Sequence, residues 1–193
     1  MSEHRVFALE GMDGSGKTTV GRMLAEQTKG AYFYCTQSSS LRPLRGYFDD
    51  KPLPVRFMYY LALVMENYPR VERLRKTSDV FYDRTLASTI AYHRAYGLSE
   101  TWFKLVPPFL SRQLDLMVYF DLGKEERKRR LGKRQVQTGV MNRNDNRSIE
   151  FDEIIYSEYQ RVMPDRTLIV STENKSPQQV TDEVRYKLYE IKR

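Results

Sequence analysis

The segment Gly11–Thr18 constrains the fold of this chain more than any other feature. It reads Gly-Met-Asp-Gly-Ser-Gly-Lys-Thr and fits the pattern G-x-x-x-x-G-K-[ST] in full. An apolar run, Val6–Glu10, precedes it, and apolar residues at helical spacing follow over Thr18–Thr28. A strand, a glycine-rich loop and a helix in this order are the context of a phosphate-binding P-loop. The sequence therefore predicts an α/β protein built around a buried parallel strand that ends at this loop.

The residue types in this loop suit the β- and γ-phosphates of a nucleoside triphosphate. Glycines allow the backbone to curl, so that successive N–H groups and the free end of the following helix face an anion. Lys17 adds a positive charge, and the hydroxyl of Thr18 is an oxygen ligand of the kind that Mg²⁺ prefers. We therefore expect ATP as the phosphate donor, together with Mg²⁺. The predicted ATP-binding residues are Gly11, Met12, Asp13, Gly14, Ser15, Gly16, Lys17, Thr18 and Thr19.

Strands and helices alternate along the rest of the chain. The expected strands are Val6–Glu10, Ala31–Thr36, Asp79–Tyr82, Leu116–Phe120 and Thr167–Ser171. The expected helices are Thr18–Thr28, Val55–Arg75, Ala87–Ala95, Glu100–Arg112, Lys124–Arg134, Ile149–Val162 and Pro177–Ile191. Prolines are expected to kink or divide the second of these helices, at Pro69, and to interrupt the fourth, at Pro107 and Pro108. The alternation predicts a three-layer α/β fold, a parallel sheet with helices on both faces.

The composition limits the kind of protein this can be. Hydrophobic residues make up 40% and charged residues 30% of the 193 residues, which is typical of a globular chain. The single cysteine, Cys35, cannot form an internal disulfide. The chain has neither a run of about 18 apolar residues nor the apolar start of a signal peptide. We expect one cytoplasmic domain over residues 1–193, with no membrane segment.

Basic residues are concentrated in residues 124–147 of a chain whose formal net charge is +7. Helical spacing places Arg127, Arg130 and Arg134 on one face. A solvated helix surface is one explanation, and a surface for a nucleic-acid backbone is another. A mobile basic lid that closes over bound phosphates fits the group better, so we predict a lid over this region.

Two segments of the sequence carry a resemblance to a known family. Residues 10–19 read Glu-Gly-Met-Asp-Gly-Ser-Gly-Lys-Thr-Thr, and residues 83–93 read Asp-Arg-Thr-Leu-Ala-Ser-Thr-Ile-Ala-Tyr-His. They are similar to the patterns E-G-x-D-G-S-G-K-T-T and D-R-Y-x-x-S-x-x-A-Y-Q of the thymidylate kinases, which are P-loop nucleoside monophosphate kinases. The resemblance implies transfer of the ATP γ-phosphate to a nucleoside monophosphate, with dTMP as the leading acceptor.

The resemblance also implies roles for single residues. Lys17 would hold the donor phosphates, and Asp13 would lie near the acceptor. Arg84 would grip the acceptor monophosphate, a task for which the planar fork of arginine is suited. Asp83 would help Thr18 to place Mg²⁺. The predicted acceptor-binding residues are Asp13, Tyr60, Arg84, Ser88, Tyr92 and His93, with Tyr60 stacked on the base.

Catalytic positive charge has to come from outside the P-loop, because Gly14 and Ser15 supply no arginine. The resemblance implies that the lid is its source. The predicted catalytic residues are Lys17, Asp13, Arg84, Arg130, Arg134 and Arg143, with Arg147 as a further candidate. The family commonly forms homodimers through helices on one sheet face, and the apolar helix over Val55–Met65 is a candidate for that contact.

The sequence departs from the family pattern where the acceptor base would be read. Valine occurs at Val64, where the family carries a base-reading arginine, and His93 replaces a glutamine. The segment Thr36–Pro43 lacks the family's R-E-P-G-G pattern. Arg56 and Arg70 are candidates to repair the loss. Phosphoryl transfer is therefore better supported than dTMP as the acceptor.

Other functions fit the P-loop less well. A regulatory GTPase needs N-K-x-D, but the similar stretch here reads Asn-Lys-Ser-Pro at residues 174–177. A nucleoside kinase generally places a glutamate after the second strand, where this chain has Gln37 and Ser38. A nucleic-acid-binding ATPase would interleave aromatic residues with its arginines, and the aromatic residues here lie mostly at core spacing. A kinase of another nucleotide, a nucleoside or a small phosphate acceptor stays open, and a nucleic-acid partner is not expected.

Overall fold

The computed structural model describes residues 4–139 and 148–190. Within them, five parallel strands form one sheet in the order β2-β3-β1-β4-β5. The strands are β1 (Val6–Gly11), β2 (Ala31–Tyr34), β3 (Val80–Asp83), β4 (Leu116–Asp121) and β5 (Thr167–Ser171). Because all of them run in one direction, the loops that follow their carboxyl ends meet along one edge of the sheet.

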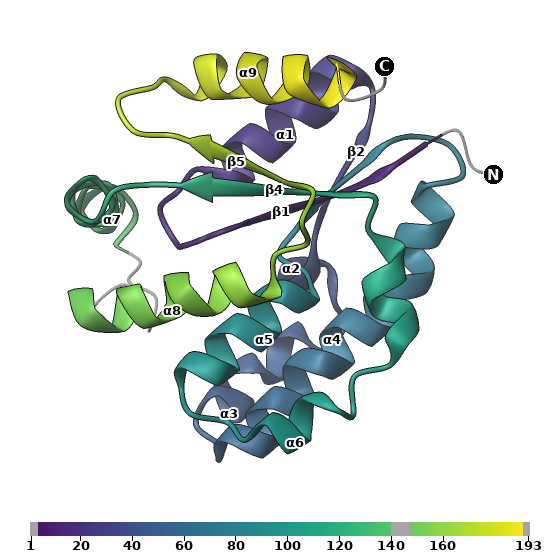
Figure 1. Cartoon of the computed structure of the whole chain (residues 1–193), viewed down its shortest axis with the longest axis vertical. Coiled ribbons are helices and arrows are strands. Elements are labelled where there is room, and N and C mark those ends of the chain that lie inside the picture. The colour runs from purple at the N-terminus through teal and green to yellow at the C-terminus, as the bar shows by residue number, and fades with distance from the viewer. Residues whose placement is uncertain (1–3, 140–147, 191–193) are drawn as a thin grey trace.

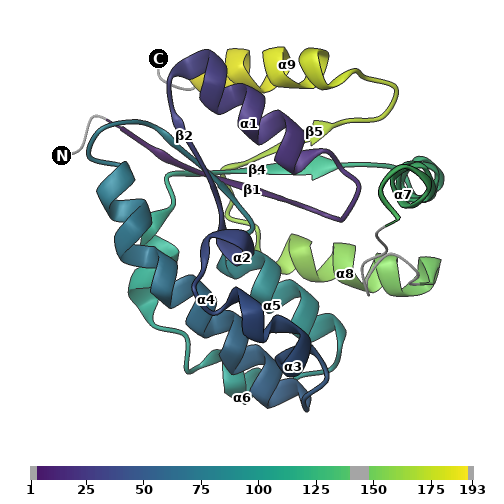
Figure 2. The same ribbon diagram turned by 180° about the vertical axis from the view of Figure 1, so that it is seen from behind.

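Helices cover both faces of this sheet, as the alternation of elements predicted. One face carries α1 (Lys17–Thr28) and α9 (Pro177–Glu190), which contact each other (Figure 1). The opposite face carries α4 (Leu53–Leu74), α5 (Leu86–Ala95) and α8 (Ile149–Val162), and Figure 2 shows the same layers from behind. The three-layer α/β arrangement is therefore confirmed.

The remaining helices lie at the edge where the strands end or within the lower layer (Figure 1). The longest of them, α7 (Lys124–Thr138), lies beyond the tip of β4. The short ones are α2 (Cys35–Ser38), a 3-10 turn at Arg42–Leu44, α3 (Arg45–Asp49), α6 (Glu100–Phe103) and a 3-10 helix at Pro108–Gln113.

The central strand β1 is buried along its whole length. Phe7 and Leu9 contact the cluster beneath α1 and α9, while Val6 belongs to the cluster around α4. A parallel strand covered on both faces needs apolar side chains at every position, and this run meets that need except at Glu10. Glu10 is fully buried and belongs to the site.

The structure differs from the expected elements at two points and agrees with them at a third. Pro69 does not divide its helix, because α4 continues through it for 22 residues while Asn67 and Val71 on either side are buried against the core. The second strand ends at Tyr34 rather than Thr36, and α2 begins at Cys35. The interruption expected at Pro107 and Pro108 is confirmed, because Glu100–Phe103 and Pro108–Gln113 are separate short helices, and Pro108 is the first residue of the second.

Two helical glycines provide a test of how tightly α1 packs on the sheet. A Cβ added at Gly21 would lie 2.5 Å from Cδ1 of Leu9 and 2.9 Å from Cε2 of Tyr32. Overpacking costs about 1–3 kcal/mol, which exceeds the gain of about 1 kcal/mol from alanine's helix propensity. We therefore expect Gly21→Ala to lower the free energy of unfolding in urea.

The matched control is Gly132 in α7, where an added Cβ meets nothing within 4 Å. Gly132→Ala should raise the free energy of unfolding by about 0.5–1 kcal/mol. A Gly21→Ala protein as stable as the Gly132→Ala protein would show that α1 does not approach the sheet so closely.

Candidate active site

The P-loop lies between the end of β1 and the start of α1. The φ angles of the three glycines are positive: +138° at Gly11, +87° at Gly14 and +91° at Gly16. Residues that carry a side chain rarely adopt such angles. At Gly11 an added Cβ would also lie 2.6 Å from the backbone oxygen of Phe120 on β4. The glycines of the motif are therefore required by the curl of the loop and by its close contact with the sheet.

Lys17 lies beneath the loop and is 5% exposed. Its ammonium donates to the backbone oxygen of Met12 at 2.6 Å and to the Ser15 hydroxyl at 3.3 Å. Burial lowers the pKa of Lys17 to about 8. The structure places this charge inside the curl of the loop, as the motif predicted.

Asp83, at the end of β3, lies beside the P-loop helix. Its Oδ2 accepts hydrogen bonds from the hydroxyls of Thr18 and Tyr32, each at 2.7 Å. Its Oδ1 has no hydrogen-bond partner among the residues that the structure describes, and the residue is 1% exposed. A buried carboxylate oxygen without a partner, next to a hydroxyl, is an oxygen donor set suited to Mg²⁺.

Arg84 follows directly and adopts a left-handed backbone conformation, with φ of 63°. Its guanidinium forms an ion pair with the carboxylate of Asp13 in the P-loop. It also donates to the Ser88 hydroxyl at 3.3 Å and lies 5.5 Å from the ring centroid of Tyr92. Four of the residues predicted to bind the acceptor are thus brought together at one point.

A buried glutamate holds this arrangement in place, and the sequence analysis assigned it no role. The carboxylate of Glu10 accepts hydrogen bonds from the backbone N–H and the hydroxyl of Thr85, both at 2.7 Å. It also accepts from the hydroxyls of Ser88 and Tyr159, the latter at 3.3 Å. Glu10 therefore ties the segment after Arg84, and helix α8, to the strand that carries the P-loop. Its place in an otherwise apolar strand was the signal in the sequence.

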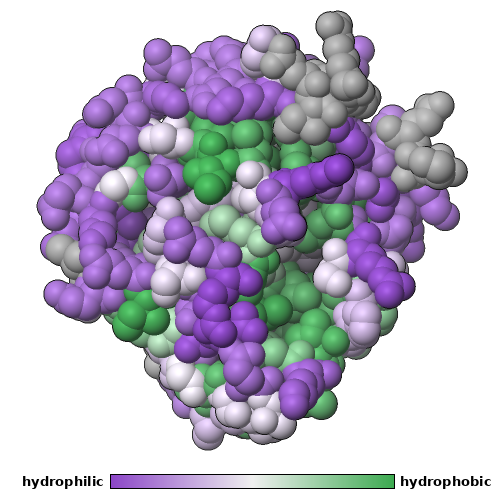
Figure 3. Space-filling model, in the orientation of Figure 1, coloured by the Kyte–Doolittle hydropathy of each residue, from purple (hydrophilic) through white to green (hydrophobic). Residues whose placement is uncertain are grey.

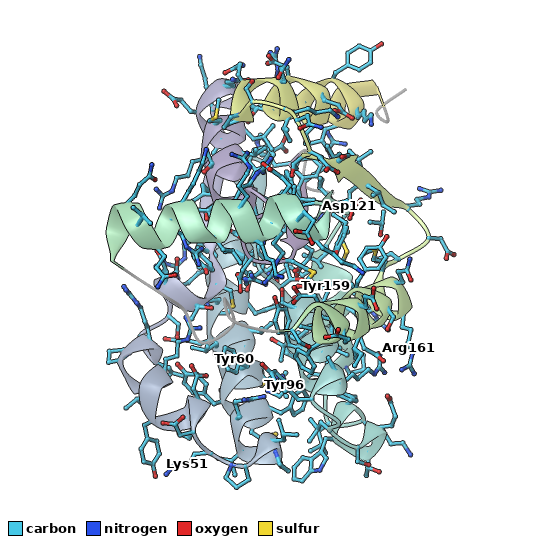
Figure 4. All side chains as sticks on the ribbon, turned by 90° about the vertical axis from the view of Figure 1, so that its left-hand side faces the viewer. Lys51, Tyr60, Tyr96, Asp121, Tyr159 and Arg161 are labelled. Atoms are coloured by element: carbon cyan, nitrogen blue, oxygen red, sulfur yellow. The ribbon has the colours of Figure 1, made fainter. Side chains whose placement is uncertain are left out.

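A cavity of about 540 Å³ opens between the P-loop and the helical layer. Its phosphate end is lined by Asp13, Gly14, Lys17, Thr18, Asp83 and Arg84, and its far end by Arg45, Asp49, Arg56, Tyr60, His93 and Tyr96. Figure 4 looks onto this edge of the sheet, with α7 crossing the strand ends and Tyr60 and Tyr96 below it. The cavity thus runs from the P-loop into the layer of α4 and α5.

The far end of the cavity combines aromatic rings with polar groups. The hydroxyl of Tyr60 donates to Asp49 at 2.7 Å, and the guanidinium of Arg56 lies 4.4 Å from the ring centroid of Tyr96. Burial lowers the pKa of His93 to about 4, so its ring is neutral. Nδ1 of His93 lies 2.7 Å from the backbone oxygen of Thr89 and must carry the proton, because a carbonyl only accepts.

Nε2 of His93 is therefore a bare acceptor. It is buried and has no partner within the described part of the chain. His93 lines the cavity, and the neutral ring of this tautomer offers a lone pair to an N–H donor.

The structure shows where the residues that depart from the family pattern, and their candidate replacements, lie relative to the cavity. Val64 is 4% exposed, belongs to the core cluster around α4 and does not line the cavity. Of the two arginines considered as replacements, Arg56 lines the cavity, whereas Arg70 donates to the backbone oxygen of Ser38 outside it. The structure also adds Arg45 and Asp49 from α3, which the sequence analysis missed because that segment gave no motif.

A second hollow, of about 460 Å³, also borders the P-loop. Gly14, Ser15 and Gly16 line it, together with Thr19 at the start of α1. Other parts of its wall come from α7 and from the loop after β5: Glu126, Arg129, Arg130, Thr172, Asn174, Lys175 and Pro177. The two hollows share Gly14, Gly16, Thr19 and Arg130 in their linings, so they meet at the P-loop.

The basic helix α7 divides into an anchored part and a part that faces the site. Arg127 is 3% exposed, forms an ion pair with Asp152 of α8 and donates to the backbone oxygen of Asp13 at 3.0 Å. Arg130 and Arg134 line the large cavity. Arg127 therefore anchors α7 to α8 and to the P-loop, although helical spacing grouped it with the other two.

Arg143 and Arg147 lie outside the described residues. Arg130 donates to the backbone oxygen of Thr172 at 2.7 Å, which joins α7 to the loop after β5.

Comparisons with known proteins agree with this geometry. The family model described as thymidylate kinase matches residues 9–184. A probable thymidylate kinase from Methanococcus vannielii is 25% identical over 195 residues, covering 94% of this chain and 93% of the relative. One from Sulfurisphaera tokodaii is 31% identical over 114 residues, covering 53% and 56%.

The chain belongs to the thymidylate kinase family. Among solved structures, the thymidylate kinase from Candida albicans superposes with a TM-score of 0.76 at 18% identity, covering 98% of this chain and 92% of that one. A deoxyadenosine kinase from M. mycoides, solved with dCMP and dCDP, gives a TM-score of 0.68 at 15% identity. These likenesses extend the fold over nearly the whole chain. Membership of the family, which the family model shows over residues 9–184, disfavours the nucleic-acid-binding ATPase as an alternative.

In the described residues, no helix has the length and apolar character needed to cross a membrane.

The unfolding free energies of two variants test whether Arg127 anchors α7. Arg127→Met removes a buried cation that pairs with Asp152 and donates to the backbone of Asp13, which should cost about 3–5 kcal/mol of unfolding free energy. Arg130→Met removes a partly exposed ion pair with Glu126 and a hydrogen bond to Thr172, and should cost about 1–2 kcal/mol. Chemical denaturation of the two variants gives both values. Equal losses would contradict the division of α7 into an anchored part and a part that faces the site.

Proposed function

We propose that this thymidylate kinase family member transfers the γ-phosphate of ATP to dTMP, giving dTDP and ADP. The observation that carries the proposal is the pair of hollows that meet at the P-loop. Lys17 and the loop backbone serve the donor phosphates, and Arg84 with Asp13 faces the larger cavity. Two phosphorylated ligands held there would meet at the loop.

The reaction needs alignment more than covalent chemistry. An oxygen of the acceptor phosphate attacks the γ-phosphorus of ATP, and the bond from that phosphorus to the β-γ bridging oxygen breaks. Arg84 is suited to hold the acceptor phosphate, because its fork offers two parallel N–H donors. Its ion pair with Asp13 and the Glu10 network fix the direction of that fork before the acceptor binds.

Mg²⁺ fits the residues at the end of β3. Thr18 supplies a hydroxyl and Asp83 a carboxylate oxygen without a partner, while phosphate oxygens and waters complete the set that this ion prefers. The described residues offer no cluster of three His, Cys, Asp or Glu side chains for a metal, so protein ligands alone would not hold it. When bound, the ion neutralises charge on the β- and γ-oxygens.

Residues 124–147 act in this proposal as a lid within a single kinase domain spanning residues 1–193. The anchor at Arg127 sets the base of the lid, and Arg130 and Arg134 face the transferring phosphate. Arg143 is a further proposed source of positive charge. A closed lid would also exclude water, which otherwise competes with dTMP as the acceptor.

The far end of the cavity supports thymine as the base. Thymine presents an N–H between two carbonyl oxygens, whereas cytosine has an unprotonated nitrogen at that position. The lone pair on Nε2 of His93 would accept the thymine N3–H, and Arg56 would donate to a neighbouring carbonyl. Tyr60 and Tyr96 supply rings on which a base can stack. This pairing replaces the arginine and glutamine that the family carries elsewhere.

A homodimer is proposed from the outer face of α4. Val55, Met58 and Met65 are 43%, 42% and 43% exposed and, with Pro69, form one stripe along the helix. Hydrophobic residues also gather among the helices below the sheet in Figure 3. A stripe of this kind is suited to a two-fold contact between copies, which sedimentation of the wild type and of Met58→Glu would test.

The cytoplasm, where ATP and free nucleotides are available, is the proposed location.

A panel of deoxynucleoside monophosphates tests the proposed reaction. ADP release with Mg²⁺ and ATP should be fastest with dTMP, slower with dUMP, and at least about 10²-fold lower in kcat/KM with dCMP, because its unprotonated nitrogen would face the lone pair of His93. If no monophosphate raises the rate of ADP release, the proposed function is contradicted.

His93 variants test the reading of the base in the same assay. His93→Ala should reduce the preference for dTMP over dCMP by about 10-fold or more, because the acceptor lone pair is lost. His93→Gln is the matched control, because an amide oxygen again accepts the thymine N–H, and the preference should be kept. If the preference is the same in His93→Ala as in the wild type, His93 does not read the base.

A further inference from the structure

The two carboxylate oxygens of Asp83 are used unequally. Oδ2 accepts two hydrogen bonds, from the hydroxyls of Thr18 and Tyr32, at 2.7 Å each. Oδ1 accepts none from any residue in the described ranges, although Asp83 is 1% exposed. Two donors on one oxygen fix the rotation of the carboxylate, so that the other oxygen is kept for a ligand that is not part of the protein.

Tyr32 acts only as a donor in this contact, because a carboxylate only accepts. Thr18 also donates its proton to Asp83, and its lone pairs are thereby left for an electrophile. Without the Tyr32 hydroxyl, Thr18 would be the one donor to Oδ2 within residues 4–139 and 148–190, and the last torsion of the carboxylate would be less restricted.

The residues around the Tyr32 ring hold its hydroxyl next to Asp83. Tyr32 lies on β2, and β3, which carries Asp83, lies between β2 and β1. The absence of a side chain at Gly21 of α1 leaves room for the ring, since a Cβ there would lie 2.9 Å from Cε2. The guanidinium of Arg22 lies 5.5 Å from the ring centroid. The hydroxyl is thus held at the end of β3 by contacts with α1.

We propose that Tyr32 is a positioning residue for the metal ion of this enzyme. It holds Oδ2 of Asp83 so that Oδ1 faces a divalent cation bound with the donor nucleotide. The inference rests on the proposed Mg²⁺-dependent kinase activity and adds a residue that does not itself touch the metal. Partners of this kind around a metal ligand typically change metal affinity by about 10–100-fold.

The test compares ADP binding with and without Mg²⁺. Calorimetric titration of Tyr32→Phe with ADP in EDTA should give the wild-type affinity within about twofold, because the P-loop contacts are retained. With Mg²⁺ present, the gain in ADP affinity should be about 10-fold or more smaller than in the wild type. In activity assays, the Mg²⁺ concentration for half-maximal rate should rise, while kcat at saturating Mg²⁺ recovers.

Tyr82→Phe is the matched control. It removes a buried tyrosine hydroxyl one residue before Asp83, on the side of β3 that faces the α4 cluster, and should leave the Mg²⁺ gain unchanged. Three results would overturn the proposal: a normal Mg²⁺ gain in Tyr32→Phe, an equal loss of ADP affinity with and without Mg²⁺, or the same reduced gain in Tyr82→Phe. Failure of the wild type to bind ADP under either condition would instead remove the proposed function.

Discussion

The candidate site depends on the hydrogen bonds that the buried carboxylate of Glu10 accepts. Glu10 lies at the end of the central strand, one residue before the P-loop, and accepts hydrogen bonds from the segment that follows Arg84. A buried charge is tolerated only when it is satisfied in this way. Because the same carboxylate also accepts a hydrogen bond from Tyr159 of α8, it joins the strand before the P-loop, the segment after Arg84 and helix α8. The left-handed backbone at Arg84 is held by these contacts.

Much of the fold, and the positions of the P-loop, Asp83 and Arg84 in the candidate site, could be predicted from the sequence, because local rules decide them. The curl of the P-loop requires glycine at Gly11, Gly14 and Gly16 whatever the rest of the fold, and a cation and a hydroxyl must follow. The strands are short apolar runs, and parallel strands place their following loops at one edge. Asp83 and Arg84 had to lie near the P-loop once β1 and β3 were adjacent.

The rest depends on contacts between distant residues, which spacing does not reveal. Arg127 and Arg130 have similar places on one helix face, and only the presence of Asp152 on α8 decides that the first is an anchor. Val64 was matched to a base-reading position, but the rotation of α4 buries it and brings Arg56 to the cavity instead. The contact of Tyr32 with Asp83 depends on the order of β2 and β3 in the sheet.

The central claim is that donor and acceptor nucleotides occupy the two hollows at once, with their phosphates meeting at the P-loop. Calorimetric titration with a bisubstrate analogue, adenosine joined to thymidine through a chain of phosphates, tests it most directly. The account predicts one site per chain and an affinity well above those of ATP and dTMP measured separately, because the two ligands are linked. An analogue that binds no more tightly than ATP, and that dTMP does not displace, would contradict it.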